Sequence, residues 1–524
     1  MIDGELTATG GGSHSVASKR SDGAVWQLFL LLAASWFVPI DMWAKNPEQP
    51  DLFITFGALF VLFSIGSLIR RALVSSRLDP VGATYIAFVL VFVFSAAGPY
   101  IGRLPLGRWG VFLGAIGTAC LLYRLRVLTS IRVTIAWAAF AMVVAPVFTF
   151  FDRQQPGPGN LTFAESWTTD LDDTRDVVFI VSDSYGSPAV LDEFYGFDNS
   201  PFVEELVGLG FVVASDAHSN YSSTIISIPS MLELGLIATN ETITNTDARR
   251  LYSIMGGEGT VPHVLAQNGY RTVYVESGWL GTQCSDAVDI CVPAPWPDET
   301  LYDIARRSLL RDLLVFEMGA AFSRGAKHAL TWLEHDLDAY LSDDVPDFVY
   351  VHLLAPHPPL FLEADCRLRP RRETSGFVIS LPSGHHERER IDAYLDQVRC
   401  VNRTLGRVAR AVVETGSVAL FVGDHGPDID GQLFAPAPSW NRNQIRARFG
   451  AMFAGYGKGC DFDRIEYVGN VGIRLLNCLG SPTLADLEPR AFLVGFSEPP
   501  FDGVHEIDPR HFWGGAEGGP VRAG

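Results

Sequence analysis

Basic residues are scarce in this sequence relative to acidic ones. Lys and Arg number 40 against 59 Asp and Glu, which gives a formal net charge of -19 at pH 7. A protein that binds nucleic acid through its general charge needs a positively charged surface for the phosphate backbone. The composition therefore argues against a nucleic-acid partner.

Cysteine is also sparse and unevenly placed. Cys120 lies alone in an apolar segment, and the sequence has no Cys-x-x-Cys pair of the kind that binds zinc. The other six cysteines all follow residue 160, and an even number is consistent with disulfides in a domain outside the cytoplasm. Their order along the chain suggests the pairs 284–291, 366–400 and 460–478, while the sequence alone leaves the connectivity open.

Long apolar runs are missing from most of the chain and are concentrated in its first 150 residues. Five segments there approach the roughly 20 residues that a helix needs to cross a bilayer core. A buried helical bundle in a soluble protein is the alternative, and five successive segments with alternating flanks argue against it. We therefore expect a domain of five transmembrane helices within residues 24–150, at 24–43, 52–69, 81–100, 107–123 and 131–150.

The basic residues beside these segments predict the orientation, because cytoplasmic loops carry an excess of Lys and Arg. Residues 1–23 are therefore expected in the cytoplasm, and five crossings leave the C-terminal two-thirds of the chain outside it. This predicts a multi-pass protein of the cell membrane with an extracytoplasmic domain. The basic residues that set this orientation lie in the N-terminal tail and in the second and fourth connections between the segments: Lys19, Arg20, Arg70, Arg71, Arg77, Arg124, Arg126 and Arg132.

The pattern changes after the membrane segments. Residues 151–175 form a polar linker with Pro and Gly, and from residue 176 short apolar runs alternate with helical stretches. This alternation predicts an α/β domain with a largely parallel sheet over residues 176–484, followed by a C-terminal extension at 485–524. The expected strands cover 177–181, 211–214, 272–275, 348–354 and 418–422, and the expected helices cover 201–209, 301–321, 326–341 and 387–414.

Three of these strands run into residues able to bind metal or phosphate. The first reaches Asp183, the fourth reaches His357, and the fifth reaches Asp424 and His425. In open α/β sheets, ligands bind beyond the carboxyl ends of the strands. We therefore expect these four side chains to meet at one edge of the sheet.

A stretch rich in hydroxyl groups covers residues 220–231 and reads NYSSTIISIPSM. Its apolar part predicts the start of a helix, and Thr224 lies at that junction, where free N–H groups and the helix dipole favour an anion. We interpret Thr224 as the nucleophile of a metal-assisted phosphoryl transfer. Taken alone, Thr224 is more simply explained as a helix N-cap.

The other candidates also have simpler explanations when each is taken alone. Asp183 can begin a turn, Asp-His-Gly is a common turn tripeptide, and His357 before two prolines can be an ordinary loop histidine. His352 lies within a strand and is expected in the core or in support of the site. The functional interpretation depends on the four ligand types occurring together, at three strand ends and one helix start.

Together these motifs resemble the alkaline phosphatase/sulfatase superfamily, in the membrane-anchored branch that includes lipoteichoic acid synthases and phosphoethanolamine transferases. The matching pieces are the strand before Asp183, T-x-x-S-x-P-x-M at 224–231, Pro-His-Pro-Pro at 356–359 and Gly-Asp-His-Gly at 423–426. The resemblance implies an alkaline-phosphatase-like (sulfatase-like) α/β fold and one divalent ion, which would be zinc, manganese or magnesium. It places His357 at the phosphate or leaving oxygen, and the metal on Asp183, Thr224, Asp424 and His425.

Three features depart from the patterns of this superfamily. The first ligand is Asp183, where lipid-modifying relatives usually carry Glu. The Cys/Ser-x-Pro-x-Arg signature of sulfatases has Met231 in place of Arg and no cysteine, which disfavours the hydrolysis of sulfate esters. Phosphoethanolamine enzymes have another His about a dozen residues after Asp-His-Gly, and its absence here removes a ligand for a second metal ion.

The sequence therefore predicts a membrane-anchored, metal-dependent transferase that moves a phosphoglycerol- or phosphoethanolamine-type group through a phosphothreonine intermediate. The expected donor is a phospholipid or lipid-linked molecule, and the expected acceptor is an extracytoplasmic glycan or lipid. A hydrolase of phosphate or sulfate esters would share the same site residues and is the alternative. A non-catalytic protein on a decayed enzyme fold would lack ligands that this chain retains.

The second substrate is expected near the Asp-His-Gly loop. Asn220, Trp440 and Arg442 are the candidate substrate-binding residues. Arg442, Arg446 and Arg448 can equally form a solvated helix face.

Overall fold

The structure is a computed structural model of residues 1–524. The chain forms two compact units, Met1–Gln155 with Asp303–Val315 and Pro156–Tyr302 with Phe316–Gly524. Within the first 155 residues the structure describes 52–96 and scattered positions. Beyond them it describes 159–161, 163, 168–295, 325–369, 385–428, 439–494, 503–507 and 520–521, apart from 464, 481 and 482.

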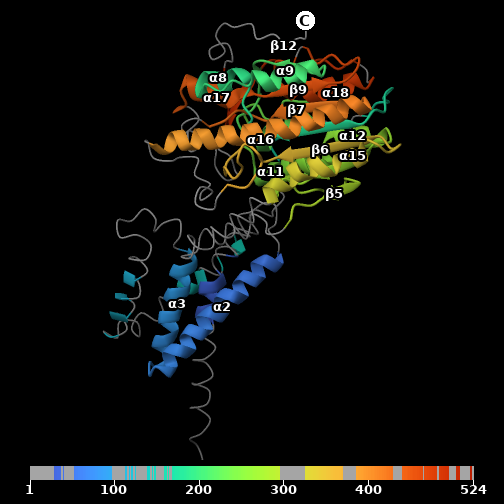
Figure 1. The fold of residues 1–524 in the computed structure, drawn as a ribbon. Coiled ribbons are helices and arrows are strands. Elements are labelled where there is room, and N and C mark those ends of the chain that lie inside the picture. Colours follow the sequence, from blue (N-terminus) through green and yellow to red (C-terminus); the bar gives the residue numbers. More distant parts are fainter. Residues whose placement is uncertain are drawn as a thin grey trace, which may run out of the picture. The chain divides into compact units, whose positions relative to one another are not determined.

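Two helices of the first unit fall on the second and third predicted membrane segments. α2 covers Leu52–Ser75 and α3 covers Pro80–Ala96, and the two helices pack against each other (Figure 1). α2 continues past residue 69, so Arg70 lies inside the helix instead of in the predicted connection. Its Nε donates to Thr84 Oγ1 on α3 over 2.8 Å.

One stretch among the described residues, Phe56–Ser75, is long and apolar enough to cross a membrane, and Pro80–Phe92 is a shorter apolar helix. Of the first, fourth and fifth predicted segments the structure describes only part, as scattered helical positions. The domain of five transmembrane helices therefore stays a prediction.

A mixed sheet of eight strands organises the second unit, in the order β12-β2-β9-β7-β1-β6-β4-β5. β1 (Val177–Ser182) pairs in parallel with β6 (Asp347–Leu353) on one side and with β7 (Val418–Gly423) on the other. β4 (Arg271–Val275) and β5 (Ile290–Val292) extend this parallel part beyond β6. The three central strands are buried along their whole length, which explains their nearly continuous apolar sequences.

The other end of the sheet departs from the largely parallel arrangement that we predicted. β9 (Phe453–Tyr456) runs antiparallel to both β7 and β2 (Val212–Ala214), and β12 (Pro520–Val521) runs antiparallel to β2. β2 therefore runs in the same direction as β7. All five predicted strands are confirmed, and β12 brings part of the predicted C-terminal extension into the sheet.

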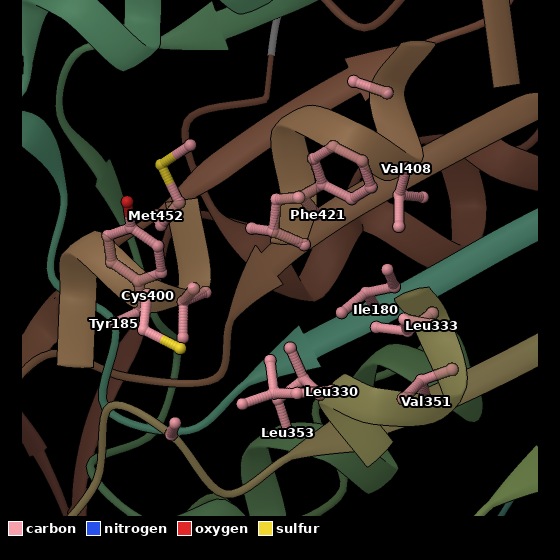
Figure 2. Packing of buried hydrophobic residues seen from close by; sticks show 14 of the residues in the cluster. Ile180, Tyr185, Leu330, Leu333, Val351, Leu353, Cys400, Val408, Phe421 and Met452 are labelled. Carbon is pink, nitrogen blue, oxygen red and sulfur yellow. The ribbon is translucent and has the colours of Figure 1, made fainter. Parts of the chain in front are cut away.

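Helices cover both faces of the sheet, and alternate residues of the strands point into two separate cores. In the first core Ile180 and Val351 of neighbouring strands lie beside Leu333 (Figure 2). This core is covered by α8 (Pro188–Tyr195), α9 (Ser200–Gly208), helical residues 325–335 and the long α16 (His385–Thr415), which crosses the strands in Figure 1. The second core is covered by α10 (Thr224–Leu232), α12 (Thr260–Gln267) and α18 (Val471–Cys478).

Three of the four helices predicted for residues 176–484 are confirmed. They correspond to α9, to residues 325–335 with α15 (Leu337–Tyr340), and to α16. The fourth, at 301–321, lies outside the described residues. Part of the predicted linker also packs on this unit, because the backbone N–H groups of Asn160 and Leu161 donate to Asp247.

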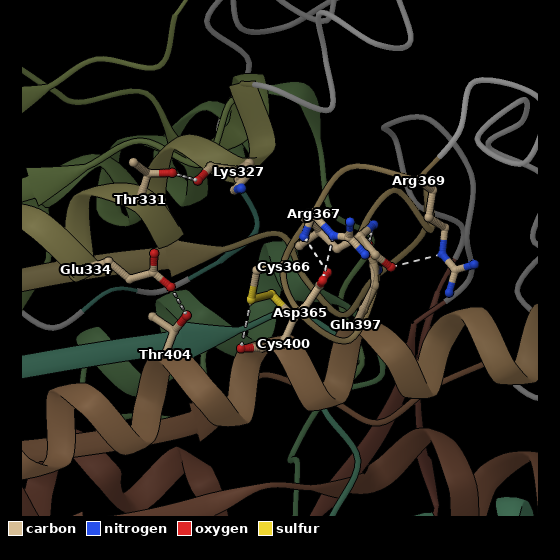
Figure 3. The surroundings of a disulfide bond; sticks show 11 residues. Lys327, Thr331, Glu334, Asp365, Cys366, Arg367, Arg369, Gln397, Cys400 and Thr404 are labelled. Atoms are coloured by element: carbon tan, nitrogen blue, oxygen red, sulfur yellow. Dashed lines mark hydrogen bonds and ion pairs between the residues drawn. A yellow bond between two sulfur atoms is a disulfide. The ribbon is translucent and has the colours of Figure 1, made fainter.

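Three disulfides join the cysteine pairs that we predicted, Cys284–Cys291, Cys366–Cys400 and Cys460–Cys478. Their presence fits a domain outside the cytoplasm. Cys366–Cys400 joins the loop after β6 to α16 (Figure 3). The disulfide therefore limits how far this loop can move away from the helix.

Candidate active site

The ends of β1 and β7 place two carboxylates side by side. Ser182 of β1 lies opposite Gly423 of β7 in the parallel register, so Asp183 and Asp424 are each the first residue beyond the paired strands. The backbone N–H of Asp183 also donates to Leu353 O of β6 over 2.9 Å. The structure therefore brings together the two aspartates that we expected at one edge of the sheet.

His425 completes a buried cluster with these carboxylates. Its Nε2 lies 3.3 Å from Asp424 Oδ2 and 3.7 Å from Asp183 Oδ1, and the three potential ligand atoms lie within 4.8 Å of one another. The Nδ1 of His425 donates to Gly426 O over 3.0 Å. This tautomer leaves the Nε2 lone pair on the side of the carboxylates.

The turn after β7 requires glycine at two positions. A Cβ on Gly426 would lie 2.0 Å from Ala447 O, and a Cβ on Gly423 would lie 2.3 Å from Tyr185 O. Any larger residue would push the backbone segments apart. The Gly-Asp-His-Gly motif therefore lets this loop pass close to α17 (Arg442–Phe449), which contains Ala447.

Thr224 reaches the cluster from the N-terminus of α10. It is the first residue of the helix, and Ser223 occupies the N-cap position. The Thr224 Oγ1 lies 3.0 Å from His425 Nε2. α10 is also fastened to the loop after β7, because Ser227 Oγ donates to Asp424 O over 2.6 Å. The explanation of Thr224 as an N-cap is therefore wrong, and its hydroxyl lies at the cluster.

Burial changes the protonation of the cluster. Desolvation raises the pKa of Asp183 to about 7, and desolvation together with the charge of Asp183 raises the pKa of Asp424 to about 7. Desolvation also lowers the pKa of His425 well below its usual value, and the charge of Arg448 adds to this effect. His425 is therefore neutral at pH 7, as a metal ligand must be.

These groups fit a divalent cation. Two carboxylates, an imidazole and a hydroxyl are the mixed nitrogen and oxygen donors that zinc and manganese accept, and magnesium accepts the oxygens. Asp424 Oδ2 is buried, and among the described residues it accepts no hydrogen bond. A bound cation would supply the missing partner and offset the burial of two neighbouring carboxylates.

A cavity lies beside the cluster, and His357, Ser184 and Arg448 form part of its lining. The Nδ1 of His357 donates to Pro358 O. Desolvation, with the charge of Arg448, lowers the pKa of His357 to about 4. The imidazole is therefore neutral at pH 7, and its Nε2 carries the lone pair. The rest of the lining combines aromatic and apolar side chains, among them Tyr195, Ile391 and Tyr394, with the charged residues Arg390 and Asp428.

One side chain of α16 holds the loop that carries His357. Gln397 Nε2 donates to Pro356 O over 3.0 Å and to His357 O over 3.2 Å. Its Oε1 accepts two backbone N–H groups further along the loop, at 2.9 and 3.1 Å. Gln397 lies one helical turn before Cys400 (Figure 3), so its amide and the Cys366–Cys400 disulfide restrain the same loop.

The sequence model of the Sulfatase family matches residues 175–458, which is more than half of the chain and includes every residue of the cluster. The chain belongs to the sulfatase family. It is an enzyme of the alkaline phosphatase/sulfatase superfamily, as its motifs predicted. No curated protein matches its sequence.

Several solved structures are similar to this sulfatase-family chain at low identity. The zinc complex of the C-terminal periplasmic domain of EcEptC from Escherichia coli has a TM-score of 0.41 at 13% identity, and covers 69% of this chain and 99% of its own. Lipooligosaccharide phosphoethanolamine transferase A (EptA) from Neisseria meningitidis, an integral membrane protein, has a TM-score of 0.40 at 14% identity, covering 88% and 96%. The lipoteichoic acid synthase LtaP from Listeria monocytogenes has a TM-score of 0.36 at 11% identity, covering 63% and 78%.

Ser184 and Arg448 belong to the site of this sulfatase-family chain although the motifs did not single them out. Ser184 donates from its backbone N to Asp424 Oδ1 over 3.1 Å and from its Oγ to Asp183 Oδ1 over 3.2 Å. Its φ of 61° is unusual for a residue other than glycine. Arg448 directly precedes the apolar run of residues 449–456, and this position could have indicated that its side chain is buried. A buried charge requires a partner, which is a reason to consider Arg448 for the site.

Two further residues bear on the comparison with sulfatases. Met231, which replaces the signature Arg, is fully buried in the second core and brings no charge to the site. His352 is also fully buried, with its Nε2 4.0 Å from Asp183 Oδ2. Desolvation and the charge of His357 lower its pKa to about 3, so His352 is a neutral group behind the first aspartate.

The three candidate substrate-binding residues have contacts that suit structural roles. The Asn220 amide donates to Arg490 O and accepts from the backbone N–H of Gly469. Trp440 is buried in a small apolar cluster, and Arg442 is the exposed first residue of α17. Their roles in substrate binding stay predictions.

Proposed function

We propose that this sulfatase-family enzyme is anchored in the membrane and transfers a phospho-alcohol group, of the phosphoglycerol or phosphoethanolamine type, from a lipid donor to an extracytoplasmic glycan or lipid. One observation carries this proposal. The Thr224 hydroxyl lies 3.0 Å from His425 Nε2, at the buried cluster of Asp183, Asp424 and His425. A nucleophile is thereby combined with a set of metal ligands at the start of one helix.

In the first step, Thr224 Oγ1 attacks the phosphorus of the donor phosphodiester. The Thr224 O–P bond forms as the bond from phosphorus to the donor alcohol breaks; Thr224 releases one proton and the departing alcohol takes up one. A divalent ion held by Asp183, Asp424 and His425 would lower the proton affinity of the hydroxyl and offset the charge of the phosphoryl oxygens. The N-terminus of α10 adds partial positive charge at the same place.

In the second step, the oxygen of an acceptor hydroxyl bonds to phosphorus as the Thr224 O–P bond breaks; the acceptor releases one proton and Thr224 Oγ1 takes one up. His357 is neutral and its Nδ1–H is held by Pro358 O, so its Nε2 can take the proton of the incoming hydroxyl. The family resemblance placed His357 at the phosphate or leaving oxygen, where protonating the departing alcohol would require an imidazolium. A pKa of about 4 makes that form rare at pH 7 before substrate binds.

The membrane anchor rests on the apolar stretch Phe56–Ser75 of α2. Three of its large apolar side chains, Phe56, Phe60 and Leu68, are 53%, 70% and 66% exposed, as side chains in contact with lipid would be. An anchor on the same chain would keep the catalytic domain close to lipid donors. The three disulfides support placing that domain outside the cytoplasm.

The test is to incubate the full chain in membranes with a phospholipid labelled in its head group, quench with acid and locate the label. We expect label on Thr224 in the wild type and none in Thr224→Ala, with activity reduced by about 10³-fold or more. Thr331→Ala, which removes an exposed threonine of the helix at 325–335, is the matched control. Label that persists in Thr224→Ala would contradict the assignment of the nucleophile.

A hydrolase of phosphate or sulfate esters is the second candidate, and the family match favours keeping it. Water would then take the place of the acceptor in the second step. Transfer predicts that the labelled product forms only when a glycan or lipid acceptor is added. Release of the labelled group at the same rate without any acceptor would favour the hydrolase.

A further inference from the structure

Arg448 is a buried cation that the two-step scheme does not use. It lies near the end of α17 and is 3% exposed. Its Nε donates to Ser222 O over 2.8 Å, its Nη1 donates to Gly426 O over 3.3 Å, and its Nη2 lies 3.0 Å from His425 Nε2. All three of these acceptors are uncharged, and the carboxylates of Asp428, Asp424 and Asp183 lie near enough to act on the charge of the guanidinium.

The contact with His425 cannot persist when the cluster holds a cation. His425 Nε2 has one lone pair, because its Nδ1 carries the proton that bonds Gly426 O. In this structure the lone pair faces both Arg448 Nη2 and Thr224 Oγ1, each at 3.0 Å, and it would bind the metal ion in the loaded enzyme. Metal binding therefore frees one N–H of Arg448, while the bonds to Ser222 O and Gly426 O keep the guanidinium in place.

The cavity offers the freed N–H its next acceptor. Arg448 lines this cavity together with His357 and Ser184, and the lining also includes Tyr195, Tyr394 and the carboxylate of Asp428. An anionic group at Arg448 would thus share the cavity with the Ser184 hydroxyl, the His357 imidazole and aromatic surface. That combination suits an ester with a negatively charged head and an organic alcohol portion.

We propose that Arg448 binds a non-bridging oxygen of the substrate's phosphate group, and that it changes partner from His425 to substrate when the metal ion binds. This rests on the proposed function, because the phosphorus in question is the one that Thr224 attacks. Arg448 supplies a fixed positive charge beside the metal ion, so charge on the phosphoryl oxygens is stabilised from two sides.

Binding measurements on the full chain in detergent test the proposal without the transfer reaction. Zinc is titrated first, followed by inorganic phosphate as the probe, for the wild type and Arg448→Gln. We expect the variant to bind phosphate about 10- to 100-fold more weakly, the effect of losing a hydrogen bond to a charged group. Zinc should bind as tightly or up to about 10-fold more tightly, because a cation beside the metal ion has been removed.

Weaker phosphate binding without weaker zinc binding would distinguish a role of Arg448 in binding the anion from a role in supporting the fold. A residue that only supports the fold would weaken zinc and phosphate binding together. Unchanged phosphate affinity in Arg448→Gln, or a parallel loss of both affinities, overturns the proposal. Arg410→Gln is the control, because Arg410 is an exposed arginine of α16 paired with Glu205, and neither affinity should change.

Arg448→Lys covers the case in which the glutamine variant does not fold. Lysine keeps the charge but lacks the planar fork that reaches Ser222 O and the cavity at once. We expect phosphate affinity to fall about 3- to 10-fold with zinc affinity within twofold. Wild-type phosphate affinity in Arg448→Lys would contradict the proposal. The result of the phosphate titration does not depend on whether the enzyme is a transferase or a hydrolase, because both would need the contact between Arg448 and the anion. Only the requirement for an added acceptor distinguishes the two functions.

Discussion

The two sides of the active site are positioned in different ways. Asp183 and Asp424 follow adjacent parallel strands whose pairing puts both one residue past the sheet edge. His357 lies on a loop that is held by one glutamine side chain and by a disulfide to α16. The carboxylate side is therefore fixed by backbone hydrogen bonds along whole strands, whereas the His357 side depends on a few side-chain contacts.

This difference assigns different tasks to the two sides. A metal ion needs ligands at fixed distances, and backbone pairing deep in a sheet supplies them with little freedom. A loop held at a few points can adjust as substrates of different shape enter and leave the cavity. Changes on the carboxylate side should therefore affect metal binding, and changes on the His357 side should affect turnover with metal binding intact.

The largest effect should come from Asp424→Asn on the carboxylate side. The amide keeps the Oδ1 acceptor for the backbone N–H groups of Ser184 and His425, but it lacks the charge. We expect loss of activity and loss of the zinc-induced rise in Tm, while the metal-free variant melts higher than the metal-free wild type because one buried charge is gone.

Thermal melts with and without zinc measure both effects. Asp338→Asn, at an exposed aspartate that pairs with Arg407, is the control and should keep the zinc response. A zinc-induced shift in Asp424→Asn equal to that of the wild type would show that Asp424 is not a ligand.

The next largest effect should be the pH dependence of stability and of zinc affinity, which arises from the carboxylates of Asp183 and Asp424. The pKa of Asp183 and of Asp424 is about 7 in the folded protein, against an ordinary value of 3.8. Between pH 4 and 7 the metal-free folded protein therefore holds protons that the unfolded chain has released, so its stability should fall as the pH rises through this range. Zinc affinity should rise over the same range, by up to about 100-fold per pH unit if two protons leave, and level off above pH 7.

Calorimetric titrations in buffers of different ionisation enthalpy report the number of protons released. His357, with a pKa of about 4, should not contribute to that number above pH 5. Proton release that is absent at pH 6 would contradict the protonation of the carboxylate pair.

A smaller effect is expected from Gln397→Ala on the His357 side. The change removes the donor to Pro356 O and His357 O and the acceptor for two backbone N–H groups. We expect kcat to fall by about 10- to 100-fold through displacement of His357, with zinc affinity within twofold of the wild type.

Two variants sharpen this test. Gln397→Glu keeps the acceptor and loses the donor, so its activity should lie between those of the alanine variant and the wild type. Gln267→Ala, at an exposed glutamine at the end of α12, should behave as the wild type. Equal losses of kcat and zinc affinity in Gln397→Ala would remove the distinction between the two sides.

The fold was predictable where local sequence decides the structure. Apolar, β-branched runs gave all five predicted strands, because strands covered on both faces must be apolar throughout. The direction of β9 was not predictable, since its sequence is equally apolar whichever way the strand runs, and the order of the chain across the sheet decides it. The five-helix membrane domain stays a prediction that the described part of the first unit tests only at α2 and α3.

The part of the candidate site that lies at the ends of strands was also predictable from the sequence. Residues that directly follow strands, such as Asp183 and Asp424, converge because parallel strands share one edge. Arg448 and Gln397 could not be found in this way, because each lies in a helix with several other polar residues and only the packing of α17 and α16 decides which side chain turns inward. Arg442 in the same helix as Arg448 is exposed, which shows how little the spacing alone reveals.

The pairing of Ser182 with Gly423 has a consequence for quality control of the folded enzyme. A slip of one position between these two strands would keep most of the apolar burial but turn one aspartate to the opposite face. Such a molecule could be soluble and compact, yet it could not retain the ion. Under the proposed function, retention of a divalent ion would report whether the chain has found its correct alignment, and would be a more sensitive assay of proper folding than solubility or helix content.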